Sequence, residues 1–174
     1  MIRMNRTVFV TLVLLLLETS VVPWLVPGNW SDRLLPHLTF IMTLYVASFG
    51  GRHPGFLFGL GFGLLGDLLF YGHLIGPYGF GMGLIGYLAG LVLEQRSFTL
   101  AFFLGVAALA GGLLDTIVFF IYKLFSLTRV SYGYAFYWQI IPTLLLELII
   151  ILALYVPVRR FLTRPLLSSG EEGA

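Results

Sequence analysis

The sequence predicts an all-α bundle of six membrane-spanning helices, and its composition is the first observation that predicts it. Of the 174 residues, 59% are hydrophobic and only 18, ten basic and eight acidic, carry a formal charge. Soluble domains usually contain roughly 25% charged residues, so this chain lacks the polar side chains that would cover a water-exposed surface. The second observation is the length of the apolar runs, because a spanning helix takes about 20 residues. These runs do not alternate with a period of two, which excludes the strands of an outer-membrane barrel.

Size and residue usage exclude several classes of function. Six spans use most of the chain, so we expect no separate catalytic or nucleotide-binding domain. A formal net charge of only +2 gives no basis for a nucleic-acid partner. The chain has no cysteine, which excludes disulfides and thiol chemistry.

Hydropathy places the spans in order, with five spans as the alternative to six. The predicted spans are residues 7–26, 35–50, 54–71, 76–93, 98–124 and 136–161. The first follows two arginines, as a signal peptide would, but no small-residue cleavage site follows it, so we interpret it as an anchor. The second is short and contains His37, Thr39 and Thr43, which indicates a helix tilted or shielded by its neighbours.

The remaining spans differ in their glycine and proline content. The third and fourth are glycine-rich, the fifth is a long apolar run, and the sixth contains Pro142 and Pro157. Proline is tolerated in a spanning helix where neighbours or water satisfy the freed carbonyl groups. Residues 1–165 are therefore predicted to form one transmembrane bundle, and the polar residues 166–174 a disordered cytoplasmic tail.

The distribution of basic residues predicts the orientation. With the N-terminus inside, seven basic residues fall on the inner side and three on the outer side, as the positive-inside rule requires. The inner residues are Arg3, Arg6, Arg52, Arg96, Arg159, Arg160 and Arg164, and the outer ones are Arg33, Lys123 and Arg129. We therefore expect both termini in the cytoplasm.

Glycines are concentrated in and around the third and fourth spans. Of the 21 glycines, 14 lie between residues 50 and 90. Gly51, Gly55, Gly59 and Gly63 recur every four residues and therefore share one helix face. Small residues at this spacing let helices approach closely in lipid. Two interpretations stay open. Either the face packs within the chain, or it docks a transmembrane helix of another protein, which makes the four glycines candidate partner contacts.

Four acidic residues, Glu18, Asp67, Asp115 and Glu147, lie inside predicted spans. Charged side chains in a membrane normally face the bundle interior, because ionised groups are costly in lipid. Counting from the span ends places all four in the middle-to-outer half of the membrane. Asp67 and Asp115 lie on parallel spans and are expected to be able to approach each other.

Three interpretations of this acidic group remain open. It forms a buried polar cluster, an outward-facing pocket for a cationic or polar ligand, or part of a proton or ion path. Sequence patterns for nucleophilic catalysis, zinc-binding helices and phosphate-binding loops are absent. We therefore expect no enzymatic activity, no cofactor and no metal.

The longest outer connection runs over residues 125–135 and continues into an aromatic group. It contains Arg129, Tyr132, Tyr134 and, just beyond it, Trp138. Such residues anchor helices at the membrane interface. Aromatic and arginine side chains also dominate protein contacts, so the four are candidate contacts for an extracytoplasmic partner.

The glycine-rich segment resembles the rod-shape-determining membrane protein family MreD. The residues that carry the resemblance are Gly55-Phe-Leu-Phe-Gly59-Leu-Gly-Phe-Gly63-Leu-Leu-Gly-Asp67, then Gly76-Pro-Tyr-Gly79 and Gly86-Tyr-Leu-Ala-Gly90. The resemblance implies a non-enzymatic scaffold of the bacterial cell-elongation machinery, in which Asp67 matches the family's recurrent aspartate.

The implied partner is a bitopic MreC-type protein in the lipid bilayer. Through it the scaffold would reach the MreB filament, a SEDS glycosyltransferase and a class B penicillin-binding protein. The family is also similar in fold to the six-helix S-components of energy-coupling-factor transporters. The alternative function is therefore a substrate-binding, S-component-like subunit of a small-solute transporter.

Overall fold

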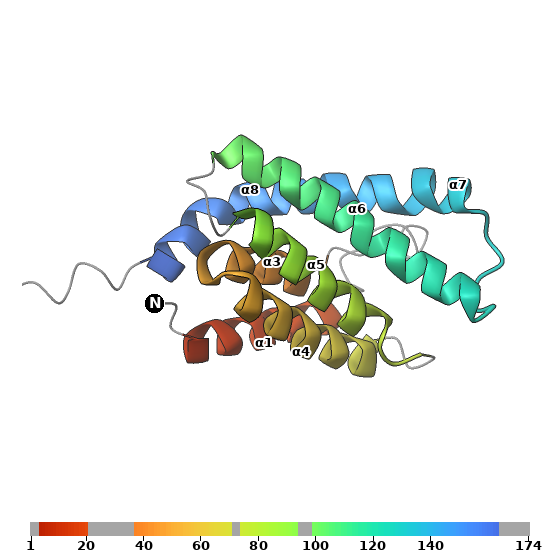
Figure 1. The fold of residues 1–174 in the computed structure, drawn as a ribbon, viewed down its shortest axis with the longest axis horizontal. Coiled ribbons are helices and arrows are strands. Elements are labelled where there is room, and N and C mark those ends of the chain that lie inside the picture. Colours follow the sequence, from red (N-terminus) through yellow and green to blue (C-terminus); the bar gives the residue numbers. More distant parts are fainter. Residues whose placement is uncertain (1–3, 21–36, 71–73, 94–98, 164–174) are drawn as a thin grey trace, which may run out of the picture.

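The computed structural model describes residues 4–20, 37–70, 74–93 and 99–163, and these residues form helices joined by short turns (Figure 1). The helices are α1 (Met4–Ser20), α3 (Leu38–Gly50), α4 (Arg52–Phe70), α5 (Pro77–Leu93), α6 (Leu100–Leu124), α7 (Tyr132–Ala135), the π-helical turn η1 (Phe136–Ile140) and α8 (Ile141–Thr163). No strand occurs in these four ranges, and the all-α prediction is confirmed.

A helix overlaps each predicted span, and the helices differ in length. Two segments, Leu100–Leu124 and Tyr132–Leu154, are long and apolar enough to cross a membrane, while Leu38–Gly50 and Pro77–Leu93 are apolar but shorter. Residues 21–26 of the first predicted span and the predicted tail 166–174 lie outside the described residues.

One boundary was wrong. The outer connection was expected to continue to residue 135, but α7 already begins at Tyr132. The Ser131 side chain accepts a hydrogen bond from the Tyr134 N–H, which caps this helix at its start.

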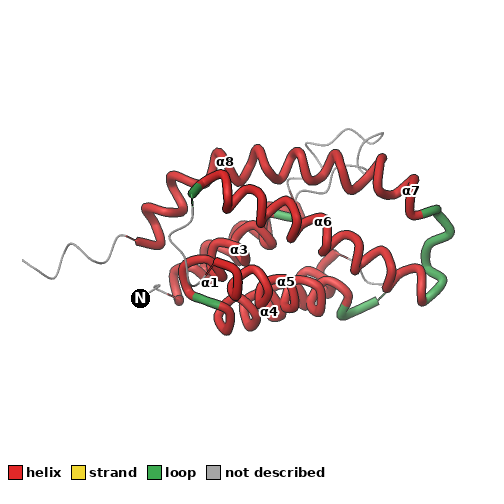
Figure 2. Tube along the Cα trace, turned by 45° about the horizontal axis from the view of Figure 1, so that its top comes forward, coloured by secondary structure: helices red, strands yellow, loops and turns green. Residues whose placement is uncertain are grey.

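Helix α3 lies at the centre of the bundle, next to α5. Helices α6 and α8 lie on one side of this pair, and α1 and α4 lie on the other side (Figures 1 and 2). Its residues from Thr39 to Ser48 are all buried. The Tyr45 hydroxyl donates a hydrogen bond to the Ile151 carbonyl of α8 at 2.8 Å, and the Tyr45 ring packs on Phe103 of α6. The shielding that the sequence predicted for this short segment is therefore provided by the chain's own helices.

Helices α4 and α5 pack backbone against backbone. A Cβ atom on Gly59 would lie 2.4 Å from the Met82 carbonyl oxygen, and one on Gly63 would lie 2.6 Å from the Tyr78 carbonyl oxygen. A Cβ atom on Gly55 would lie 2.7 Å from the carbonyl oxygen of Gly86. These glycines therefore face α5 of the same chain, and a partner helix would have to displace α5 to reach them.

The turn between α3 and α4 depends on Gly51. This residue has φ of 90°, a conformation that residues with a Cβ atom rarely adopt. Its N–H donates to the Ala47 carbonyl and ends α3. Gly51 therefore has a role within the chain as well.

Helices α6 and α8 cross at a small residue and diverge toward the right-hand end of Figure 1. A Cβ atom on Gly111 of α6 would lie 2.7 Å from the Leu144 side chain of α8. The π-helical turn η1 ends at Ile140, two residues before Pro142. Proline has no N–H for the carbonyl of Trp138, and just before it the helix widens, so that the Ile141 N–H bonds to the carbonyl of Phe136, five residues earlier.

We predict that Gly59→Ala destabilises the bundle by about 1–3 kcal/mol, because the new methyl group would overlap the α5 backbone. The matched control is Gly61→Ala on the same helix, where an added Cβ meets nothing within 4 Å. Alanine favours helix over glycine by about 1 kcal/mol, so the control should be neutral or slightly stabilising. Thermal unfolding in detergent measures both, and equal midpoints for the two variants would contradict the packing described.

Candidate functional site

Asp67 of α4 holds the start of α5. Its side chain is 0% exposed. Oδ2 accepts hydrogen bonds from the backbone N–H groups of Gly76 and Gly79, both at 3.0 Å, and Oδ1 accepts one from Tyr78 at 3.3 Å. The first N–H groups of a helix have no acceptor within the helix and carry its positive dipole end, so a carboxylate is the favoured partner there.

The sequence Gly76-Pro-Tyr-Gly79 allows the backbone conformation that these hydrogen bonds to Asp67 require. Gly76 has φ of 123°, which favours glycine, and Pro77 occupies the first helical position, where its missing N–H costs nothing. A Cβ atom on Gly79 would lie 2.7 Å from the Leu64 side chain. Asp67 and the glycine-proline motif therefore form one structural unit.

Two further acids hold the start of α3. Glu18 of α1 accepts hydrogen bonds through Oε2 from the Thr39 N–H at 3.1 Å and from the Thr39 hydroxyl at 2.9 Å. Glu147 of α8 accepts through Oε1 from the His37 N–H at 3.2 Å. Carboxylates from two different helices thus cap α3, and we call the end of the bundle where α3 and α5 begin the capped end.

His37 connects the two capped helix starts. Its Nδ1 lies 3.0 Å from Glu147 Oε1, and because a carboxylate only accepts, Nδ1 is the donor. Its ring packs on Tyr78, in the first turn of α5, with 5.2 Å between ring centroids. Gly111 leaves room for the carboxylate, since a Cβ atom there would lie 3.0 Å from Glu147 Oε2.

Asp115 differs from the other three acids. It is partly exposed on α6 and receives no hydrogen bond from any residue that the structure describes. It interacts electrostatically with His37 and Glu147. Asp67 bonds to backbone N–H groups at the start of α5.

The capped end also contains a polar atom that the capping bonds leave without a partner. His37 Nε2 is buried and has no hydrogen bond within the described part of the chain. That part of the chain also contains no cluster of His, Cys, Asp or Glu side chains arranged to hold a metal ion. Sequence analysis found the four acids but not the backbone N–H groups that donate to Glu18, Asp67 and Glu147.

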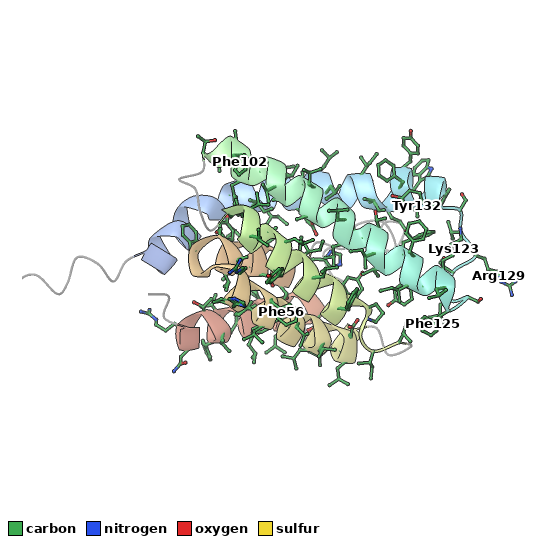
Figure 3. All side chains as sticks on the ribbon, in the orientation of Figure 1. Phe56, Phe102, Lys123, Phe125, Arg129 and Tyr132 are labelled. Atoms are coloured by element: carbon green, nitrogen blue, oxygen red, sulfur yellow. The ribbon has the colours of Figure 1, made fainter. Side chains whose placement is uncertain are left out.

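The aromatic segment divides into a packed residue and exposed ones. The Tyr132 ring contacts Phe119, Phe120 and Phe136, and its hydroxyl lies 3.1 Å from the Thr116 hydroxyl. The side chains of Arg129, Tyr134 and Trp138 are exposed, the last two by 50% and 49%. Figure 3 shows Tyr132, Lys123, Phe125 and Arg129 gathered at one end of α6, with Phe102 at the other.

We predict that Asp67→Leu lowers stability by about 3 kcal/mol or more, because it leaves three backbone N–H groups without an acceptor. Asp67→Asn keeps one acceptor oxygen and should fall between this variant and the unmodified protein. Thermal unfolding in detergent distinguishes the three proteins. A leucine variant as stable as the unmodified chain would show that Asp67 does not hold α5.

Comparison with known proteins assigns the family. The profile of the family described as rod shape-determining protein MreD matches residues 1–164 of the chain. Curated proteins and solved structures give no match. The family match covers nearly the whole chain, including the glycine helix, Asp67 and both capped helix starts. The two long apolar helices agree with a membrane protein. The chain belongs to the MreD family of rod shape-determining proteins.

Proposed function

We propose that the protein is a non-enzymatic, multi-pass scaffold of the bacterial inner membrane that binds a bitopic MreC-type partner. Through that partner it would act on the MreB filament, a SEDS glycosyltransferase and a class B penicillin-binding protein. The family match over residues 1–164 carries this proposal, because the family is defined by a role in cell shape. We further propose that both termini are cytoplasmic, which places the capped end on the outer side.

The use of the buried acids supports a structural role. Among the described residues, the hydrogen bonds to Glu18 and Asp67 are all donated by residues at helix starts, and Glu147 binds the residue that precedes α3. Carboxylates engaged in this way position helices and are not poised to attack or protonate a substrate. Such bonds fix the relative positions of the helices at one end of the bundle. A scaffold requires fixed helix positions, because they give a partner a constant binding surface.

The aromatic segment is the surface that we assign to the partner. The helix face that carries Gly55, Gly59 and Gly63 is covered by α5, so its role is to let α4 and α5 pack together. Tyr134 and Trp138 are half exposed, and their rings lie 6.2 Å apart between centroids. Exposed paired aromatic side chains are typical of contact anchors. Tyr132 would hold this surface against α6 through its ring contacts with Phe119 and Phe120.

The alternative, an S-component-like transporter subunit, is favoured by two polar groups that lack a hydrogen-bond partner. Asp115 lacks a hydrogen bond among the described residues, and His37 Nε2 is buried without a partner. Groups of this kind are found where a small solute binds. The alternative requires a bound solute and an ATPase partner in place of a cell-elongation complex.

We predict that the double substitution Tyr134→Ala and Trp138→Ala reduces co-purification of an MreC-type protein at least tenfold, because loss of two anchors typically costs more than 1 kcal/mol each. Phe102→Ala is the matched control, because Phe102 is also an exposed aromatic residue but lies at the opposite end of α6 (Figure 3). Pull-down from detergent-solubilised membranes with quantitative mass spectrometry measures the effect. Equal recovery with the double variant and the control would remove this surface from the proposal, and absence of any such partner would contradict the scaffold.

A further inference from the structure

The connection between α6 and α7, residues 123–131, has both apolar and basic side chains on its surface, and we call it the hairpin tip. Its apolar side chains are exposed, by 80% in Leu124 and 58% in Phe125. Lys123 and Arg129 are exposed as well, and Figure 3 shows both at the same end of α6 as Phe125. A surface of this composition fits the boundary of a membrane, where apolar groups meet acyl chains and basic groups meet headgroups.

The two basic side chains of the hairpin tip have no acidic partner. Neither forms an ion pair with a residue that the structure describes. The sequence has no aspartate or glutamate between Asp115 and Glu147, so no acid of the hairpin itself balances them. The Lys123 Nζ lies over the Phe119 ring at 5.9 Å from its centroid, a contact that leaves the positive charge in place. The hairpin tip therefore needs an anion from outside the hairpin.

Hydrogen bonds at the end of α6 close the backbone of the hairpin tip. The Leu127 N–H donates to the Tyr122 carbonyl at 2.9 Å, and the Ser126 N–H donates to the Lys123 carbonyl at 3.0 Å. Together they form a Schellman motif, for which Ser126 adopts the required left-handed conformation with φ of 58°. Ser131 caps the start of α7 on the other side. The basic side chains therefore project from a closed, hydrogen-bonded turn.

The length of α6 favours a position of the hairpin tip at the depth of the lipid phosphates. A helix of 25 residues is about 38 Å long, which exceeds the roughly 30 Å hydrocarbon core of a bilayer. Lys123, in the last turn, is the only basic residue of α6, so the excess length is best accommodated at that end. The segment Tyr132–Leu154, which follows the tip, is also long and apolar enough to cross a membrane.

We propose that the hairpin tip binds the headgroup of an anionic phospholipid, with the Arg129 guanidinium and the Lys123 ammonium donating to phosphate oxygens. Both groups only donate, and the planar guanidinium matches two oxygens of one phosphate. Choline and ethanolamine lipids carry a cation that neutralises their own phosphate, so only an anionic lipid balances the charge of the tip. This site goes beyond the scaffold role and is separate from Tyr134 and Trp138, the surface assigned to the protein partner.

The test uses the full chain in nanodiscs of phosphatidylglycerol and phosphatidylcholine in equal amounts. In each preparation one of the two lipids carries a photoreactive diazirine at the start of an acyl chain. Mass spectrometry after irradiation measures the labelling of residues 124–130 relative to Leu57 and Leu68, two exposed residues of α4. On this ratio, phosphatidylglycerol should label the tip at least fivefold more than phosphatidylcholine, because each basic residue at a membrane surface favours anionic lipid by roughly that factor. High salt should reduce the preference.

Two double variants distinguish charge from packing. Lys123→Gln with Arg129→Gln removes both charges and should bring the labelling ratio of the two lipids to about one. Lys123→Arg with Arg129→Lys keeps both charges and should keep most of the preference. All four substitutions are at exposed side chains without an ion pair in the described chain, so we expect both variants to fold.

Two results would overturn the proposal. Equal labelling of the unmodified tip by the two lipids would do so, and it would leave an acidic protein segment as the partner of these charges. A preference that survives in the glutamine variant would do so as well. The nanodiscs contain no MreC-type protein, so either result leaves the scaffold proposal untouched, and loss of that partner would leave the lipid site untouched.

Discussion

Hydrogen bonds from helix-start N–H groups to carboxylates of other helices are the interaction on which the rest of this structure depends. Helices α3 and α5 begin inside the bundle, and the N–H groups of a first turn have no acceptor within their own helix. A helix of 13 residues is about 20 Å long, shorter than the roughly 30 Å hydrocarbon core of a membrane. A start buried away from water must therefore be satisfied by protein groups. Glu18, Asp67 and Glu147 supply them from α1, α4 and α8.

Close packing of the backbones makes these bonds geometrically accessible. Asp67 can reach the start of α5 only because α4 and α5 lie in backbone contact, and Gly59 and Gly63 permit that contact. The glycines of α4 and Asp67, which follows them in the sequence, therefore act together to hold α5 in place. Gly111 has the same relation to Glu147, since it lets α6 approach the carboxylate on α8. A side chain at any of these glycines would separate a helix start from its cap.

Sequence reasoning predicted the helices well because their ends are marked locally. The helix predicted for residues 76–93 runs from Pro77 to Leu93 in the structure, since glycine and proline mark its start. The start at Tyr132 was missed because a single serine cap stands among aromatic residues that suggested an interfacial loop. The backbone N–H groups that donate to the acids were not predicted, and neither was the choice of acid that each polar side chain contacts. His37 and Glu147 are 110 residues apart, and their pairing depends on how three helices pack.

These hydrogen bonds give this member of the MreD family a defined arrangement of helices. The central claim is that carboxylates cap α3 and α5 from other helices, and amide hydrogen exchange tests it most directly. The amides of Thr39, Tyr78 and Gly79 should exchange as slowly as those in the middle of their helices. Ala101, in the exposed first turn of α6, provides the internal reference for an uncapped amide. Exchange of the three amides as fast as that of Ala101 would contradict the account.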